Sequence, residues 1–183
     1  MTRVMALPFS RPLTADDLDS MPDDGHRYEL LDGVLIVSPS PSELHQRVVG
    51  QLHLLLQAAR PADFEVFVAP LDVLLAPDTV VIPDLLVTER IEVPGRRIVL
   101  PPRLAIEVLS PSSRRIDMLL KRSRLEAAGV PSYWVVDPLN PRLIAWELRD
   151  EVYVEVADVS GAEAASLTAP FPVTVIPSRL VTV

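Results

Sequence analysis

Two acidic residues lie alone in apolar segments of the chain. Asp84 is the only charge in residues 80–87 (VVIPDLLV), and Glu107 is the only charge in residues 104–109 (LAIEVL). An ionised carboxylate in apolar surroundings is costly, so each should have a metal, a cation, a set of donors or a retained proton. Carboxylate oxygens without thiolates select a hard cation. The pair is therefore a candidate Mg²⁺ or Mn²⁺ site.

Lys121 is the only lysine in the chain, against sixteen arginines. A solitary lysine suggests a role that requires a compact ammonium, or one that requires a group able to lose its proton. A guanidinium cannot lose its proton in this way. Asp117 precedes it by four residues, so both share one face of a predicted helix. This helix follows the Glu107 segment and could present Lys121 over the end of that strand. An exposed Asp–Lys pair of little energetic weight is the alternative interpretation.

Composition removes several other kinds of site. The chain has 183 residues, no cysteine and three histidines, which excludes disulfides, thiolate metal sites and thiol nucleophiles and leaves little for zinc. The length fits one domain with a real core. Residues 1–13 have no long apolar region, and no segment approaches the roughly 18 apolar residues of a membrane span. We expect a cytoplasmic protein.

The charge is unevenly distributed. The net charge of −8 argues against a protein that coats nucleic acid, yet nine basic and three acidic residues lie between Arg90 and Arg124. This distribution permits a local phosphate-facing surface on an acidic body, with Arg114 and Arg115 as candidate substrate-binding residues. A solvated charged face is the alternative.

The N-terminal third predicts a hairpin followed by a long helix. Residues 28–31 and 34–37 flank Asp32-Gly33, a dipeptide suited to a type I′ turn. Residues 40–43 (SPSE) resemble a capping box with proline at the first helical position, and the helix should run to about Ala59 before Pro61. Its predicted buried stripe is Leu44, Val48, Leu52, Leu55, Leu56 and Ala59.

The remaining pattern predicts an α/β (α+β) fold with a mixed central β-sheet flanked by helices. We expect strands at 64–69, 71–75, 80–87, 103–109, 133–136 and 173–176, and a C-terminal β-hairpin at 142–148 and 152–156. Ser113 should cap a helix that runs to about Ala128 and is closed by Gly129. A short helix is expected at 14–20. Residues 1–26 then form a lead-in to a single domain at 27–183.

Five motifs in this order resemble the Uma2 family (DUF820) of the PD-(D/E)XK nuclease superfamily, and they span most of the chain. They are residues 28–33 (YELLDG), Pro83-Asp84, residues 107–113 (EVLSPSS), the Asp117 and Lys121 pair, and residues 129–137 (GVPSYWVVD). The chain departs from the superfamily's namesake motif, which has a lysine where this chain has Leu109. Lys121 resembles a migrated replacement.

The resemblance implies a restriction-endonuclease-like core and a metal-dependent endonuclease that hydrolyses DNA. It implies that Asp84 and Glu107 are metal ligands, with the Val108 carbonyl as a third, and that Lys121 orients or activates water. Glu29 becomes either a further catalytic acid or a hairpin-edge carboxylate. His45 either faces substrate phosphate, orders a ligand, or is structural. A homodimer is a reasonable expectation for a small nuclease.

Two alternatives stay open at this point. The acidic composition and Leu109 in the namesake position motivate a non-catalytic oligomeric binding or regulatory protein on the same fold. A Ser-Lys hydrolase using Ser110 or Ser112 with Lys121 would act without metal. The second leaves both lone acids unexplained.

Overall fold

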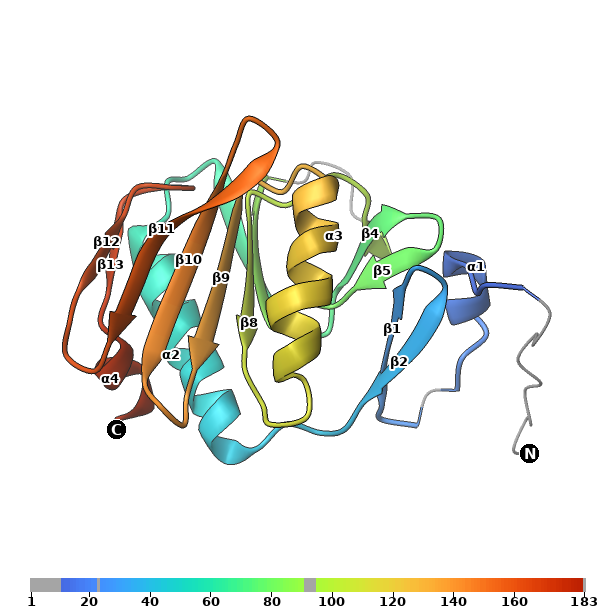
Figure 1. The fold of residues 1–183 in the computed structure, drawn as a ribbon, viewed down its shortest axis with the longest axis horizontal. Coiled ribbons are helices and arrows are strands. Elements are labelled where there is room, and N and C mark those ends of the chain that lie inside the picture. The colour runs from blue at the N-terminus through green and yellow to red at the C-terminus, as the bar shows by residue number, and fades with distance from the viewer. Residues whose placement is uncertain (1–10, 23, 91–94, 183) are drawn as a thin grey trace.

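The computed structural model describes residues 11–22, 24–90 and 95–182, which form three sheets with helices around them (Figure 1). The helices are α1 (Ala15–Leu18), α2 (Glu43–Ala59), the π-helical turn η1 (Ile116–Lys121), α3 (Arg122–Ala127) and α4 (Pro177–Val181). The strands are β1 (Arg27–Leu31), β2 (Val34–Ser38), β3 (Phe64–Val68), β4 (Asp72–Ala76), β5 (Thr79–Val81), β6 (Leu85–Glu89), β7 (Arg97–Ile98), β8 (Leu104–Val108), β9 (Ser132–Asp137), β10 (Arg142–Arg149), β11 (Val152–Ser160), β12 (Ala165–Leu167) and β13 (Val173–Val175). The predicted α/β (α+β) class is confirmed. None of the helices in these ranges is long and apolar enough to cross a bilayer.

Strand pairing in the described ranges gives a large sheet, a small sheet and the separate two-stranded pair β12–β13. The large sheet has the order β11-β10-β9-β8-β6-β3, and the small sheet has the order β2-β1-β5-β4-β7. Within the large sheet only β8 and β9 are parallel. A parallel pair needs a crossover connection, and the helix formed by η1 and α3 supplies it. The mixed sheet expected from the sequence is confirmed.

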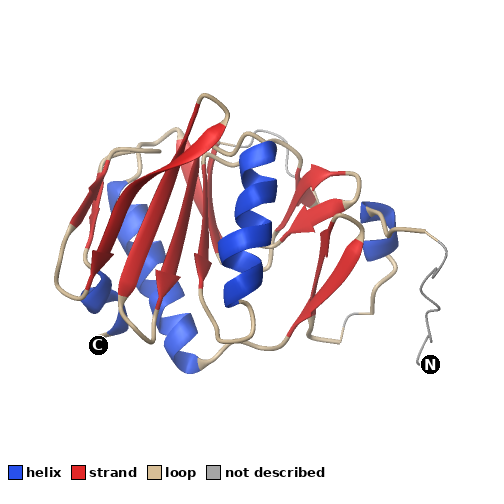
Figure 2. Cartoon of the chain, viewed as in Figure 1, coloured by secondary structure: helices blue, strands red, loops and turns tan. Residues whose placement is uncertain are grey.

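Helices cover both faces of the large sheet (Figure 2). On one face α2 packs through Val48, Leu52 and Leu56 against apolar residues of β6, β8 and β9, together with β12, β13 and α4. On the other face α3 and the small sheet enclose a second core that contains Leu125 and Tyr133. Two-sided burial explains why β8 is apolar throughout except for its one glutamate.

The N-terminal hairpin and long helix agree with the sequence, with local corrections. Asp32 and Gly33 have φ of 52° and 74°, as a type I′ turn requires. The N-cap of α2 is Ser42, whose hydroxyl accepts from the backbone N–H of His45, so the predicted cap lies two residues too early. The predicted stripe misses buried His45 and Val49, and it includes three residues that are only partly buried: Leu44, Leu55 and Ala59.

The predicted strand at 80–87 is wrong as a single element. The chain forms β5 in the small sheet, passes through Ile82, Pro83 and Asp84, and enters the large sheet as β6. Pro83 has no N–H for a ladder, so the continuous strand is interrupted there. Asp84 therefore lies at a strand entrance instead of within a strand.

The predicted helix at 113–128 also differs from the structure. Helical turns begin at Arg114, directly after Ser113, whose carbonyl accepts a 3.0 Å hydrogen bond from the N–H of Asp117, but the middle is the π-helical turn η1. Strand β11 reaches Ser160, beyond the predicted 156, and β7, β12 and α4 were not predicted. Part of the predicted lead-in packs on the small sheet, where Leu13, Ala15 and Leu18 contact Leu30 and Val80. The domain boundary at residue 27 stays a prediction, and residues 1–10 lie outside the described ranges.

Candidate active site

Strand register brings Asp84 to Glu107. Leu85 of β6 pairs with Ile106 of β8 in an antiparallel ladder, so the next step of the ladder sets Asp84 opposite Glu107. The Asp84 carboxylate also accepts a 2.9 Å hydrogen bond from the backbone N–H of Val108. Both acids are buried. Two strands of the large sheet therefore present two carboxylates at one point.

Asp84 is held by two cationic or potentially cationic side chains. Arg27 Nη1 donates to Asp84 Oδ1 at 2.9 Å, and His45 Nε2 lies 3.0 Å from Asp84 Oδ2. Burial raises the pKa of Asp84, but the His45 contact, the Val108 N–H and Arg27 together lower it below its ordinary value. Asp84 is therefore ionised. Sequence reasoning missed Arg27, because an arginine at the start of a hairpin strand carries no local sign of burial.

Lys121 lies among three carboxylates. Its Nζ is 2.8 Å from Glu107 Oε1, 2.8 Å from Glu29 Oε1 and 3.5 Å from Asp117 Oδ1. All four side chains are buried. The prediction that the helix carries Lys121 to the Glu107 strand is confirmed in its geometry. Glu29 is a buried member of this group, on a strand that lies between β2 and β5, whereas the alternative interpretation had made it a hairpin-edge carboxylate.

Burial and neighbouring charge act on these groups in opposite directions. Burial lowers the pKa of Lys121, but Glu107, Glu29 and Asp117 raise it well above its ordinary value, so Lys121 is an ammonium. Burial raises the pKa of Glu107 well above its usual range despite Lys121, and nearby Asp117, Asp84 and Glu29 add to this shift. Burial likewise raises the pKa of Asp117, with Lys121 opposing it. The group holds more negative charge than one lysine can balance.

The donor set fits a hard divalent cation. Glu29, Asp84, Glu107 and Asp117 supply carboxylate oxygens, and the buried Asp117 Oδ1 has no hydrogen-bond partner. Within the described ranges no group of three or more His, Cys, Asp or Glu side chains is arranged so that it could hold a metal ion by itself. Mg²⁺ usually keeps several waters and takes one or two protein carboxylates together with substrate phosphate. Asp84 and Glu107 with solvent therefore suffice chemically.

Comparison with known proteins identifies the family and the fold of this chain. The family model for Uma2, described as a putative restriction endonuclease, matches residues 15–179. The chain belongs to the Uma2 family. Among curated proteins, none matches the chain. The crystal structure of a putative nuclease of DUF820 from Anabaena variabilis ATCC 29413 superposes with a TM-score of 0.73 and 18% identity, over 92% of this chain and 97% of that chain. At this identity the likeness shows the fold.

The predicted substrate-binding arginines of this Uma2 domain do not contact the carboxylates of the candidate site. Arg114 pairs with Asp137 at the end of β9, and Arg115 is exposed at the start of the same helix. The serines of the preceding loop bond to one another: Ser110 Oγ lies 3.0 Å from Ser112 Oγ. Because Lys121 Nζ contacts carboxylates instead of these hydroxyls, the geometry gives the Ser-Lys alternative no support.

The basic segment of the Uma2 domain is largely neutralised by intramolecular pairs. Six of its nine cations lie within ion-pair distance of an acid of the same chain: Arg96, Arg97, Arg103, Arg114, Lys121 and Arg124. Arg122 lies over the ring of Trp146 instead. The expected phosphate-facing surface is therefore not a continuous field of free positive charge.

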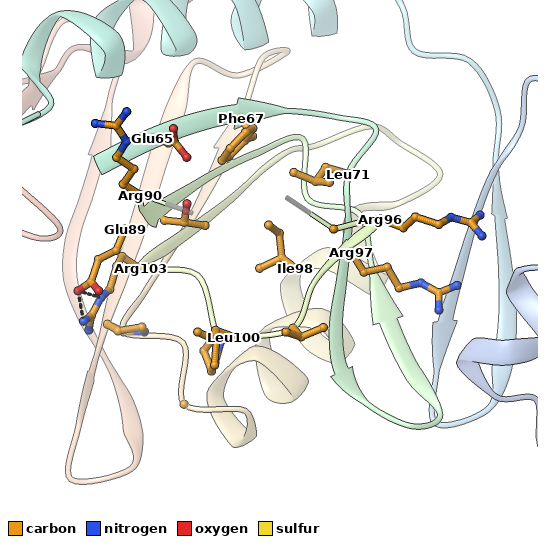
Figure 3. Close-up of a pocket in the computed structure, with 16 residues that line it drawn as sticks. Glu65, Phe67, Leu71, Glu89, Arg90, Arg96, Arg97, Ile98, Leu100 and Arg103 are labelled. Atoms are coloured by element: carbon orange, nitrogen blue, oxygen red, sulfur yellow. Dashed lines mark hydrogen bonds and ion pairs between the residues drawn. The ribbon is translucent and has the colours of Figure 1, made fainter. Parts of the chain in front are cut away.

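A cavity of about 1020 Å³ lies away from the candidate site of the Uma2 domain. Figure 3 shows its lining, which includes Phe67 and Ile98 as well as Arg103 beside Glu89. Glu89 ends β6, whereas Asp84 precedes it, so the two are separated by about 17 Å along the strand. None of the predicted site residues lines this cavity. The candidate site therefore rests on the buried charges and not on this cavity.

Proposed function

We propose that this protein is a metal-dependent endonuclease that hydrolyses DNA phosphodiester bonds. The observation that carries the proposal is the convergence of Asp84, Glu107 and Lys121 at paired strand ends, with Lys121 Nζ 2.8 Å from Glu107. Family membership and the fold support a nuclease. The metal, the DNA substrate and the residue roles are our inference.

Asp84 and Glu107 would hold Mg²⁺ or Mn²⁺, with the Val108 carbonyl as a third ligand. When bound, the cation would offset charge on the scissile phosphate and lower the pKa of a bound water. The pKa of Asp84 lies below its ordinary value, which keeps that carboxylate ionised, and a bound cation would share its oxygens with Arg27 and His45. Arg27 and His45 would hold Asp84 in one orientation.

Lys121 would act as a charged donor. Three carboxylates raise its pKa well above its ordinary value, which favours orientation of water and stabilisation of developing negative charge over proton abstraction. In the proposed reaction a water oxygen attacks phosphorus and gives a proton to solvent, while the P–O bond to the leaving sugar oxygen breaks and that oxygen takes a proton from solvent to become a hydroxyl. Glu29 would keep Lys121 in place, because it contacts Nζ at 2.8 Å.

The test is nicking of supercoiled plasmid by the purified protein with Mg²⁺, Mn²⁺ or EDTA. We expect metal-dependent nicking that falls by roughly 10²-fold or more in Asp84→Asn, Glu107→Gln and Lys121→Met, since each loses several kcal/mol of transition-state stabilisation. Asp158→Asn is the matched control, because Asp158 is a partly exposed acid paired with Arg142. Circular dichroism checks that every variant is folded.

Nicking that survives EDTA, or that persists in Asp84→Asn, would show that the chemistry is placed wrongly. Absence of nicking by the wild type in every metal would remove the catalytic proposal. The predicted homodimer and cytoplasmic location stay predictions.

One observation favours the alternative of a non-catalytic binding or regulatory protein. The internal pairing of most cations between Arg90 and Arg124 leaves little free positive charge for phosphate. Isothermal titration with Mn²⁺ separates the two functions. Tight metal binding that is lost in Asp84→Asn supports the endonuclease, whereas weak binding that the substitution does not change supports the alternative.

A further inference from the structure

The π-helical turn η1 has the reverse of the polarity that burial normally selects. Its charged residues Asp117 and Lys121 are 2% and 4% exposed, while two of its four apolar residues, Leu119 and Leu120, are 59% and 51% exposed. The other two, Ile116 and Met118, pack partly buried against the core. The hydrophobic effect alone favours a rotation that buries the leucines. Such a rotation would withdraw Lys121 from Glu107 and Glu29. The ion pairs of Lys121 and the packing of Ile116 and Met118 oppose that rotation, and a specific contact to the backbone of the turn would oppose it further.

A tyrosine from the central sheet makes that contact. Tyr133 Oη donates a 2.9 Å hydrogen bond to the backbone carbonyl of Asp117. The bond is buried and joins β9 directly to the first part of the turn. Burial raises the pKa of Tyr133 well above its ordinary value, so the hydroxyl keeps the proton that it donates.

Tyr133 is itself rigidly placed. It is 0% exposed in a strand bonded on both sides, with β8 as one neighbour and β10 as the other. Its ring stacks on Trp146 and Tyr153 at centroid distances of 5.9 and 6.3 Å. A side chain confined in this way cannot move far relative to the sheet. Its hydroxyl therefore holds the contacted turn at a fixed position on the sheet.

The π-helical geometry makes such an anchor useful. A π-turn carries i→i+5 hydrogen bonds, is rare, and occurs mostly as single turns within α-helices. It inserts about one residue, or about 100° of rotation, between the helix before it and the helix after it. The Asp117 carbonyl lies at the second residue of η1. A bond there fixes the rotation at which Lys121 leaves the turn.

We propose that Tyr133 is a positioning residue that holds η1 in the orientation presenting Lys121 to Glu107 and Glu29. Its ring contributes to the core, and its hydroxyl fixes the position of Lys121 through η1. The consequence for DNA cleavage rests on the proposed function, whereas the consequence for the lysine does not. Leu119 and Leu120 supply the opposing tendency.

Tyr153 provides a matched control within the same aromatic stack. It is buried, and its hydroxyl donates a 2.9 Å hydrogen bond to the carbonyl of Val130, beyond the end of α3. Tyr153→Phe therefore removes one buried hydroxyl bond to a backbone carbonyl, as Tyr133→Phe does. The two variants differ in whether that carbonyl belongs to η1.

The first readout is accessibility of the Lys121 amine. Because Lys121 is the only lysine, dimethylation by formaldehyde and a borohydride, followed by mass spectrometry of its peptide, reports on one side chain. We expect Tyr133→Phe to increase the labelling rate at least tenfold over the wild type and over Tyr153→Phe. Both variants should show similar midpoints in urea unfolding. Equal protection of Lys121 in both variants overturns the proposal.

The second readout is rescue by the leucines. In a Tyr133→Phe background, Leu119→Ser with Leu120→Ser removes the apolar surface that favours rotation, so protection of Lys121 should return towards the wild-type rate. The same pair in the wild type should leave labelling unchanged. Failure of the rescue shows that Tyr133 acts only through general stability, and it overturns the proposal even if Tyr133→Phe alone increases labelling.

Plasmid nicking gives the third readout. We expect Tyr133→Phe to reduce kcat about tenfold with little change in KM, and Tyr153→Phe to leave both unchanged. If the wild type does not cleave DNA, the labelling results still decide the role of Tyr133, and only the nuclease proposal fails. Increased labelling with an unchanged kcat would keep Tyr133 as the anchor of Lys121 and remove Lys121 from the proposed chemistry.

Discussion

Two ion pairs with similar N···O distances differ in how far solvent reaches them. Lys121 and Glu107, 2.8 Å apart, are buried between a helix and the large sheet. Arg142 and Asp158, 2.5 Å apart, cross the β10–β11 hairpin with side chains that are 45% and 33% exposed. Water screens the hairpin pair and hydrates its charges. The buried charges around Lys121 lack this hydration, so contacts within the protein must stabilise them.

The comparison teaches that charge is retained in the core for a reason other than stability. Exposed pairs typically contribute about 0–1 kcal/mol. Replacing a buried ion pair with packed apolar residues is often neutral or stabilising, whereas removing one partner is strongly destabilising. The raised pKa of Glu107, caused first by burial, shows how poorly the site solvates its own charge. Such an arrangement is typical of a site that acts on a ligand.

The largest expected effect comes from breaking the buried group. Lys121→Met should lower the free energy of unfolding by about 3–5 kcal/mol, because three carboxylates lose their shared cation. Urea unfolding followed by circular dichroism measures it. Arg122→Met is the control, since Arg122 is the next residue and lies over Trp146 at 5.2 Å instead of contacting the carboxylates. A loss below about 1 kcal/mol for Lys121→Met would contradict the comparison.

An intermediate effect is expected at Glu29, which joins the buried group to the backbone. Its Oε1 accepts a 2.7 Å hydrogen bond from the N–H of Ile82, just before Asp84. Glu29→Ala should cost about 1–3 kcal/mol more than Glu29→Gln, because glutamine keeps an oxygen acceptor and alanine leaves the N–H unpaired. Equal unfolding free energies for the two variants would mean that water replaces the carboxylate.

The smallest effect is expected on the hairpin. Arg142→Ala should change the free energy of unfolding by less than about 1 kcal/mol, because solvent already screens the pair with Asp158. The same unfolding measurement in low and high salt checks the attribution. A loss comparable with that of Lys121→Met would remove the distinction between the two systems.

The sequence predicted the residues that meet in the buried charged group better than the elements that carry them. A lone charge in an apolar run is a local signal, and it located Asp84 and Glu107 without any knowledge of strand order. The rarity of lysine located Lys121. Arg27 and Asp117 were missed as site members because their burial depends on which face of another segment they meet. An i,i+4 acid such as Asp117 looks the same on an exposed helix as on a buried one.

The errors in the fold have a similar origin. Apolar composition runs unbroken through 80–87, but Pro83 separates two strands that belong to different sheets. Pro83 favours a break in the strand, but the apolar composition of the segment favours one continuous strand. The π-helical turn left no trace in a 3.6-residue period, because its leucines face solvent and its charges face inward. Strands of two or three residues, such as β7 and β12, are fixed by their neighbours and not by their own propensity.

The parallel pairing of β8 with β9 bears on how such sites are recognised in other sequences. Because the pairing obliges the chain to cross over the sheet, the helix of η1 and α3 passes beside the strand that bears Glu107. A cation on this crossover is fourteen residues from Glu107 in the chain and 2.8 Å from it in space. Leu109, which stands where the superfamily's namesake motif has a lysine, is buried in the core. A search pattern confined to one strand would overlook this constellation, whereas a pattern written on the strand–helix–strand unit would find it.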